Sequence, residues 1–169
     1  MNIGDLTKEQ LKEHIVNMGE SAFRAKQIFK WVHGGAQSTD EMTNLSLSLR
    51  QKLSENFEIY LPTVYKKLTS KLDGTVKYLL KLSDGNIIET VVMDYHHGKS
   101  ICISSQVGCR MGCTFCASTL KGLVRNLTPY EIEVQILRAQ KDLCLIISNI
   151  VIMGIGEPLD NYDNIIAFL

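Results

Sequence analysis

The feature that most constrains the fold is the alternation of strand and helix patterns in the last third of the chain. Residues 101–104 and 145–153 are two mainly apolar runs, and the second suits a strand that is covered on both faces. Between them, residues 128–131 (TPYE) combine a threonine cap, a proline and a glutamate in the order that starts a helix. A strand, a helix and a strand in this order predict an α/β fold with a parallel pair joined by a right-handed crossover.

Residues 1–60 are predicted to form a helical module. Thr7 and Gln10 fit a capping box at the start of a first helix. Ser21 can cap a second helix, and a third is expected over residues 46–57. The side chains expected on the apolar faces are Leu6, Leu11, Ile15, Val16 and Met18 in the first helix, Phe23, Ile28, Phe29, Trp31 and Val32 in the second, and Leu47, Leu49, Leu53 and Phe57 in the third.

The middle of the chain has the periodicity of strands. Two Asp-Gly turns, at residues 73–74 and 84–85, are flanked by runs rich in β-forming side chains over residues 75–82 and 87–93. Dipeptides of this kind favour tight hairpins. We therefore expect an antiparallel β-meander over residues 61–98.

The composition is that of a globular protein of the cytoplasm. Of 169 residues, 45% are hydrophobic, and 18 lysines and arginines balance 18 aspartates and glutamates. This zero net charge argues against a polycation that coats nucleic acid, but a local basic face remains open. The N-terminus does not resemble a signal peptide, and no apolar run reaches the length of a membrane span. We expect a cytoplasmic location, a reducing environment and no membrane partner.

Three of the five cysteines lie within eight residues, in the sequence CRMGCTFC. Cys109, Cys113 and Cys116 can converge on one inorganic centre, and three protein ligands leave a coordination position open for chemistry. The residues alone allow three interpretations: an iron–sulfur centre, a zinc site completed by His96 or His97, or three buried thiols. In a reducing compartment, metal ligation is favoured over disulfides.

The spacing of the three cysteines resembles the cluster-binding signature of radical S-adenosylmethionine enzymes. In that superfamily the thiolates hold a [4Fe–4S] cluster, whose fourth iron is chelated by S-adenosyl-L-methionine. A second landmark is the sequence GIGEP at residues 154–158, which alone reads as a turn after a strand. The resemblance implies that Gly156 and Glu157 bind the ammonium group of the cofactor. A carboxylate at the carboxyl end of a parallel strand suits that role.

Within this superfamily the chain resembles the N-terminal half of the dual-specificity adenine-C2 methyltransferases that act on 23S rRNA and tRNA. The matching segments are residues 23–31 (FRAKQIFKW), 88–91 (IETV), 102–109 (CISSQVGC) and 125–128 (RNLT). The resemblance implies methylation of C2 in the peptidyl-transferase-centre adenosine and in an anticodon-loop adenosine, through a methylcysteine intermediate. It also implies that residues 99–169 are the first part of an incomplete (β/α) barrel.

Two further roles follow from the resemblance. Cys102 matches a cysteine that helps to resolve the covalent enzyme–RNA intermediate, and Glu89 matches the family's proton acceptor. Without the resemblance, Cys102 would be interpreted as a buried strand thiol and Glu89 as a carboxylate that faces solvent. Cys144 lies between two leucines and is expected in the core without a catalytic role.

The resemblance also implies partners, namely 23S rRNA, tRNA and an electron donor such as flavodoxin or ferredoxin. An enzyme can reach C2 only when the adenine is accessible and unstacked. The helical module is therefore expected to bind the folded RNA that presents this base. Six basic side chains are candidates for phosphate contacts, although such side chains otherwise form solvated faces. They are Arg24, Lys26, Lys30, Lys66, Lys67 and Lys71.

Other functions remain open at the level of the sequence. A related branch methylates C8 of the same rRNA adenine and shares both motifs, and the chain is also compatible with a non-catalytic RNA-binding fragment or a zinc-stabilised module. The family's methyl-accepting cysteine has no counterpart in residues 1–169, and few barrel strands are expected. We therefore expect this chain to be inactive alone, with residues 145–153 forming a strand unpaired on one side.

Overall fold

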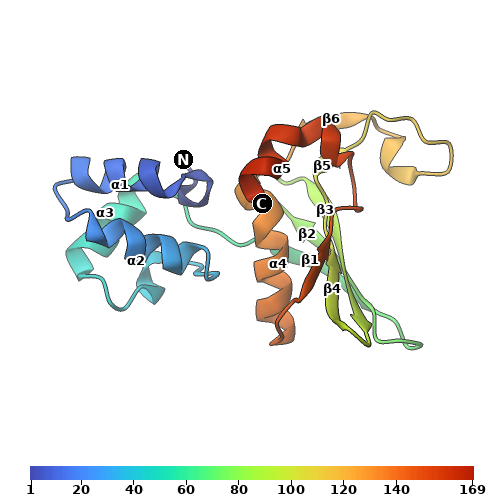
Figure 1. Ribbon diagram of the computed structural model, residues 1–169, viewed down its shortest axis with the longest axis horizontal. Coiled ribbons are helices and arrows are strands. Elements are labelled where there is room, and N and C mark those ends of the chain that lie inside the picture. Colours follow the sequence, from blue (N-terminus) through green and yellow to red (C-terminus); the bar gives the residue numbers. More distant parts are fainter. The chain divides into compact units, whose positions relative to one another are not determined.

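The computed structural model describes residues 1–169 and divides them into two compact units, Met1–Leu61 and Pro62–Leu169 (Figure 1). The division falls next to the end expected for the helical module. The first unit is helical, and the second contains a mixed sheet with helices, so the fold is α/β as expected. No helix of the structure is long and apolar enough to cross a membrane.

The first unit contains three α-helices and two short 3₁₀ helices. Their bounds are α1 (Lys8–Asn17), α2 (Phe23–Val32), α3 (Leu47–Asn56), η1 (Ile3–Asp5) and η2 (Thr39–Glu41). The predicted capping box is confirmed, because Thr7 Oγ1 accepts from Gln10 N at 3.2 Å and Gln10 Oε1 from Thr7 N at 2.9 Å. The predicted Ser21 cap is wrong: the cap position of α2 is Ala22, without a side-chain hydrogen bond.

The core of the first unit is narrower than the apolar pattern indicates. Leu11, Ile15, Ile28, Val32, Leu49 and Leu53 are almost completely buried, as expected. Val16, Phe23 and Leu47 are 49%, 63% and 75% exposed, so their assignment to the buried faces is wrong. Three ten-residue helices bury only one stripe each, and apolar side chains beside that stripe stay in solvent.

The second unit is built on a five-stranded sheet with the order β1-β2-β3-β4-β7. Its strands are β1 (Thr63–Thr69), β2 (Val76–Lys81), β3 (Ile87–Tyr95), β4 (Gly98–Cys102) and β7 (Asn149–Val151). Strands β1 to β4 form the predicted antiparallel meander, whereas β7 pairs with β4 in parallel. The meander and the parallel strand therefore share one sheet, and the predicted parallel crossover pair is confirmed.

Helix α4 (Pro129–Leu143) makes the crossover and lies along one face of the sheet (Figure 1). Its predicted capping box is present, with Thr128 Oγ1 accepting from Glu131 N at 3.2 Å. Ile132 and Ile136 belong to the buried core that includes alternate side chains of the central strands, such as Tyr78. A 3₁₀ helix, η4 (Pro158–Asn161), and α5 (Tyr162–Phe168) follow β7.

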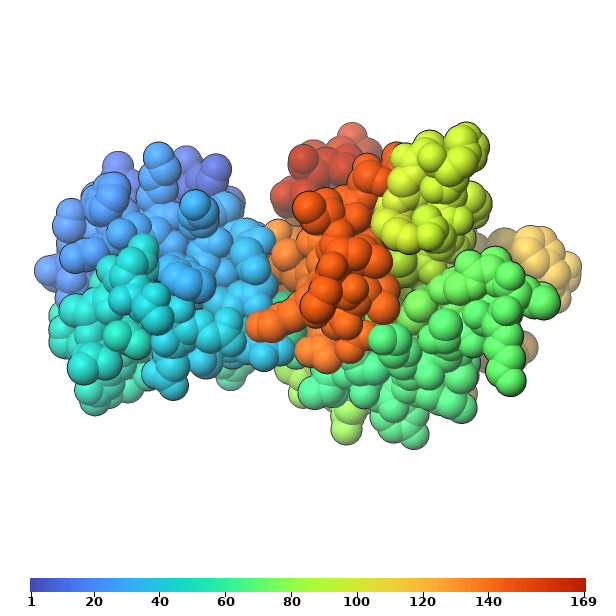
Figure 2. Space-filling model, turned by 90° about the horizontal axis from the view of Figure 1, so that it is seen from below, coloured from blue at the N-terminus to red at the C-terminus, as the bar shows by residue number.

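Strand β7 is shorter and more open than the apolar run predicts. It spans three residues, and Ile150 and Val151 are 46% and 39% exposed. Figure 2 shows this segment, in orange, on the visible surface of the second unit beside the yellow-green β3–β4 turn. Because both side chains are partly exposed, the expectation of cover on both faces is wrong for this structure. The strand pairs with β4 alone, so the expected unpaired edge is present.

The C-terminal end of α4 corrects the prediction for Cys144. This residue caps the helix in the left-handed conformation, with φ of 51°, and its side chain is exposed. The apolar neighbours in sequence suggested a core thiol. Helix ends often require a left-handed residue, and that requirement places the side chain outside the core.

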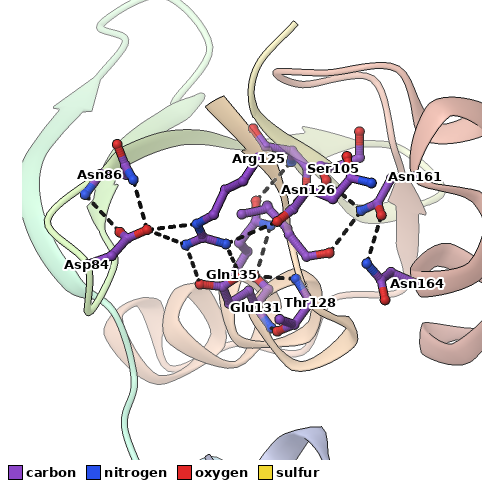
Figure 3. A network of polar contacts seen from close by, with 12 residues as sticks. Asp84, Asn86, Ser105, Arg125, Asn126, Thr128, Glu131, Gln135, Asn161 and Asn164 are labelled. Carbon is purple, nitrogen blue, oxygen red and sulfur yellow. Dashed lines mark hydrogen bonds and ion pairs between the residues drawn. The ribbon is translucent and has the colours of Figure 1, made fainter. Parts of the chain in front are cut away.

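A charged network fixes the start of α4 against strand β6 (Leu123–Asn126), as Figure 3 shows. Arg125 contacts the two carboxylate oxygens of Glu131 at 2.6 and 2.8 Å, and its Nε donates to Asp84 at 2.7 Å. The hydrogen bond to Glu131 raises the pKa of Arg125 above its ordinary value. The guanidinium thus connects β6, α4 and the β2–β3 turn.

Arg125→Met should lower the free energy of unfolding by about 2–4 kcal/mol, because the nearly buried Glu131 carboxylate loses its counter-charge. Urea unfolding followed by far-UV circular dichroism measures this change. Lys99→Met is the matched control, since it removes an exposed pair with Asp94 and should cost less than about 1 kcal/mol. Equal losses in the two variants would contradict a structural role for the Arg125–Glu131 pair.

Candidate functional site

The parallel ladder between β4 and β7 continues past the ends of both strands. Ile103 N donates to Val151 O at 2.9 Å, and Gly154 N donates to Ile103 O at 3.0 Å. Ser105 N then donates to Ile155 O at 2.9 Å. These bonds place the turn formed by residues 154–158 directly against the segment that precedes the cysteine-rich loop.

Two glycines of this turn are required by close approach. A Cβ at Gly154 would lie 2.8 Å from Ile103 O, and a Cβ at Gly156 would lie 2.6 Å from Gln106 Cβ. Gly156 also has φ of 105°, which side chains rarely allow. Beneath it, Ser105 Oγ is buried without a hydrogen-bond partner. The turn therefore has a backbone path that only glycine permits.

Polar side chains support the turn from below. Ser104 Oγ donates to Glu89 O at 2.6 Å and accepts from Ile155 N at 3.0 Å. Ser104 is held in turn by the buried amide of Gln135, which bonds both its N–H and its C=O at 2.9 Å. A single hydroxyl thus links the strand that carries Glu89 to the turn before Glu157.

The Glu157 side chain takes part in the local structure of the turn. Its Oε1 accepts from Leu159 N at 3.0 Å, which caps η4. Its backbone N–H donates to Gln106 Oε1, also at 3.0 Å. Asn161 anchors the end of η4 by donating to Ser105 O at 2.8 Å and to Leu127 O at 2.9 Å, as Figure 3 shows.

The cysteine-rich loop lies between β6 and β5 (Gln106–Gly108), a short antiparallel pair that the sequence did not predict. Cys109 N donates to Gly122 O at 3.1 Å and closes the base of the loop. Within it, Cys116 N donates to Cys113 O at 3.0 Å. In Figure 1 the loop projects beyond the β5–β6 pair and carries the short helix η3 (Ala117–Thr119).

The three cysteines differ in exposure and are not assembled into a ligand set. Cys109 is buried, Cys116 is half-buried and Cys113 is exposed. No group of three histidine, cysteine, aspartate or glutamate side chains is arranged to hold a metal ion. Three thiols in one exposed loop suit an iron–sulfur centre in type and number, but their side chains must converge to bind it.

The alternative zinc site is not assembled either. His96 and His97 lie in the β3–β4 turn, where the His97 ring stacks on Tyr95 at 5.2 Å between ring centroids. This turn precedes β4, whereas the cysteine loop follows the other end of that strand. The two histidines are therefore separated from the thiols by the length of β4.

Glu89 and Cys102 lie on the same face of the sheet, opposite α4. Val91 is the pairing partner of Cys102, and Glu89 lies two residues before it on the same side of β3. Lys77 Nζ forms an ion pair with Glu89 at 2.8 Å. Burial raises the pKa of the Cys102 thiol, and this effect outweighs a hydrogen bond from the Met153 backbone. The thiol is half-buried, not fully buried as expected.

Sequence reasoning missed the polar residues that connect the loop to the turn. Arg110 forms an ion pair with Asp160, and Gln106 donates to Asp160 Oδ2 at 2.9 Å. One signal was present: Gln106 is a long amide in an otherwise apolar and small-residue strand. A buried amide of this kind needs partners from elsewhere in the fold.

Two grooves of about 770 and 650 Å³ flank α2 in the first unit. Lys26 and Lys30 line both grooves, and Lys8 Nζ lies 5.1 Å from the centroid of the Phe29 ring. In the second unit, Lys67 forms an ion pair with Asp142 at 2.6 Å, so it is already neutralised. Of the six basic candidates, Lys26 and Lys30 are the two that line a groove.

Both the sequence and the fold of this chain match those of known methyltransferases. A sequence model described as "Ribosomal RNA large subunit methyltransferase N-terminal domain" matches residues 1–59. A crystal structure of a radical SAM methyltransferase from Sphaerobacter thermophilus superposes with a TM-score of 0.90 and 38% sequence identity, over 99% of this chain and 50% of that chain. The fold is thus that of one half of a radical SAM methyltransferase.

The curated relatives are more specific. The chain is 57% identical to a probable dual-specificity RNA methyltransferase RlmN of Clostridium novyi, over 99% of this chain and 49% of the relative. It is 59% identical to the corresponding protein of Alkaliphilus oremlandii, over 97% and 48% of the two chains. It spans about half the length of these relatives. The chain matches the N-terminal half of the dual-specificity RNA methyltransferase family.

Gly156→Ala should displace the turn, because the new Cβ meets Gln106 and the backbone is in a region unfavourable to alanine. The free energy of unfolding should fall by about 1–3 kcal/mol more than in Gly74→Ala. Gly74 is the matched control, since it has φ of 73° but nothing within 4 Å of a Cβ. Urea unfolding measures both losses, and equal values would show that close approach is unimportant at Gly156.

Proposed function

We propose that this chain supplies the N-terminal half of a radical SAM methyltransferase that methylates C2 of adenine in 23S rRNA and tRNA through a methylcysteine intermediate. The observation that carries the proposal is the packing of the 154–158 turn on residues 103–106, immediately before the cysteine loop. The names of the relatives support RNA methylation as the activity. The residues between Glu89 and Glu157 supply several groups that such a reaction needs.

Under this proposal, Cys109, Cys113 and Cys116 hold a [4Fe–4S] cluster, and Gly156 and Glu157 bind S-adenosyl-L-methionine. When bound, the two groups would supply the radical chemistry that an unactivated carbon requires. The chain's own contribution is to bind and orient them. The glycines of the turn let its backbone pack closely on residues 103–106, which holds Glu157 in place next to the segment that leads to the cysteine loop.

Glu89 and Cys102 are proposed to act on the substrate as proton acceptor and as the thiol that resolves the enzyme–RNA intermediate. Their common face supports this proposal, because both side chains then address one substrate from neighbouring strands. The raised pKa keeps the Cys102 thiol protonated near neutral pH. Its Sγ proton must therefore leave before the sulfur can act as a nucleophile.

RNA is proposed to dock on the first unit through α2. Lys26 and Lys30 are one helical turn apart, which sets two ammonium groups on one face, where they can neutralise neighbouring phosphates. Phe23 is 63% exposed and Trp31 is partly exposed, so both offer ring surface to an unstacked base.

An electron donor such as flavodoxin or ferredoxin is proposed as a further partner.

The activity can be tested in a chimera that joins residues 1–169 to the C-terminal half of the Clostridium novyi relative. After anaerobic reconstitution, we expect iron and sulfide to bind and 2-methyladenosine to form on 23S rRNA fragments, read by mass spectrometry. Cys113→Ser should abolish both the bound iron and the product, because one cluster ligand is lost.

Cys144→Ser is the matched control, since Cys144 is exposed at a helix end and has no proposed ligand role. It should leave iron content and product unchanged. Stoichiometric zinc without iron or sulfide would contradict the proposal. Formation of 8-methyladenosine in place of the C2 product would contradict the proposed position of the methyl group.

The double variant Lys26→Ala, Lys30→Ala should bind an anticodon stem-loop about threefold to thirtyfold more weakly, because two phosphate contacts are lost. The slope of log K against log salt should become shallower by roughly two. Fluorescence anisotropy of the labelled RNA measures both. Lys52→Ala is the control, since Lys52 already pairs with Glu20 at 2.8 Å. An equal loss in that variant would contradict a specific α2 contact.

A further inference from the structure

The cysteine loop and the 154–158 turn are far apart in sequence but are joined by a continuous polar chain. Arg110 follows the first cysteine of the loop, and its guanidinium contacts Asp160 Oδ1. The other carboxylate oxygen of Asp160 accepts from Gln106 Nε2 at 2.9 Å. Gln106 Oε1 then accepts from Glu157 N at 3.0 Å. No other side chain of the loop makes an ion pair.

Gln106 lies at the centre of this series of hydrogen bonds. It is completely buried, and its amide donates to Asn126 Oδ1 at 2.8 Å as well as to Asp160. Its carbonyl oxygen is used by the Glu157 backbone. Both ends of the amide are therefore engaged, and only a planar group with donors at one end and an acceptor at the other fits this position.

Asp160 connects this centre to the surface. Its backbone N–H donates to Glu157 O at 3.1 Å, so the residue is fixed to the turn as well as to Gln106. The Asp160 side chain is 13% exposed, whereas that of Arg110 is 62% exposed. Arg110 thus reaches inward from a solvent-exposed loop to a carboxylate that the fold already holds in place.

We propose that Gln106 and Asp160 are positioning residues that couple the conformation of the cysteine loop, through Arg110, to that of the 154–158 turn. Loop order then stabilises the turn, and turn order stabilises the loop, because the two segments share one hydrogen-bonded carboxylate. The coupling itself is independent of any cofactor. Its consequence for cofactor binding rests on the proposed function.

Amide hydrogen exchange of the 169-residue chain, without cluster or cofactor, tests the coupling. Arg110→Ala should accelerate exchange at residues 155–160 by about twofold to fivefold, although Arg110 lies outside that segment. Lys67→Ala is the matched control, since it removes another partly exposed ion pair in the same unit. It should leave residues 155–160 unchanged. Acceleration confined to residues 109–122 would overturn the proposal.

A rescue experiment separates a specific contact from general loosening. Gln106→Glu keeps the acceptor for Glu157 N but sets a second carboxylate against Asp160, so exchange at residues 155–160 should rise about tenfold. Adding Asp160→Asn restores a donor opposite the new carboxylate and should recover part of the lost protection, leaving the acceleration of about twofold to fivefold that loss of the Arg110 ion pair produces. A double variant that exchanges at least as fast as Gln106→Glu alone would overturn the proposal.

The consequence for cofactor binding is tested with the 169-residue chain after anaerobic reconstitution with iron and sulfide. Equilibrium dialysis should show that Arg110→Ala weakens binding of S-adenosyl-L-methionine by about twofold to fivefold at unchanged iron content. Unchanged affinity would overturn the consequence for the cofactor and leave the measured coupling in the cluster-free chain. Failure of the unmodified chain to bind iron would count against the proposed function, whereas the exchange result would still decide the coupling.

Discussion

The second unit depends on the parallel pairing of β4 with β7. This pairing is the only parallel one in the sheet, and α4 must cross the sheet to make it. The backbone bonds that follow it, as far as Ile155, fix the 154–158 turn against the strand that leads to the cysteine loop. Both sequence landmarks are therefore positioned by one ladder of backbone hydrogen bonds, which Gly154 allows to approach closely.

Around the end of the ladder, buried polar side chains fix the 154–158 turn by hydrogen bonds to the backbone. The amide of Gln135 satisfies the backbone of Ser104, whose hydroxyl in turn satisfies Ile155. Two residues after Ile155, the side chain of Gln106 likewise accepts a hydrogen bond from the backbone N–H of Glu157. A buried amide left unpaired is costly, so each of these contacts selects one arrangement of the turn over alternatives that an apolar contact would tolerate.

Local patterns with a physical mechanism predicted the fold well. The capping boxes at Thr7 and Thr128, the two Asp-Gly hairpins and the crossover helix are all present, because each depends on a few neighbouring residues. The exposure of Phe23 and Leu47 was not predictable, because it depends on how little of each helix its neighbours cover. The Arg110–Asp160 contact was not predictable either, because its partners lie fifty residues apart.

The cysteine loop, to which the proposed function assigns metal binding, is the part of the candidate site that the fold constrains least. Cys109 is anchored at the base of its loop, whereas Cys113 lies in an exposed segment with few backbone bonds. A loop of this kind gains order when a metal centre draws the thiolates together, since ligand binding then supplies the free energy that packing does not. The rigid ladder below fixes one end of that arrangement, and Arg110 carries the constraint towards the turn. A rigid turn and an adaptable loop are thus complementary, because the loop can adjust its three cysteines to a bound centre while the turn keeps its position.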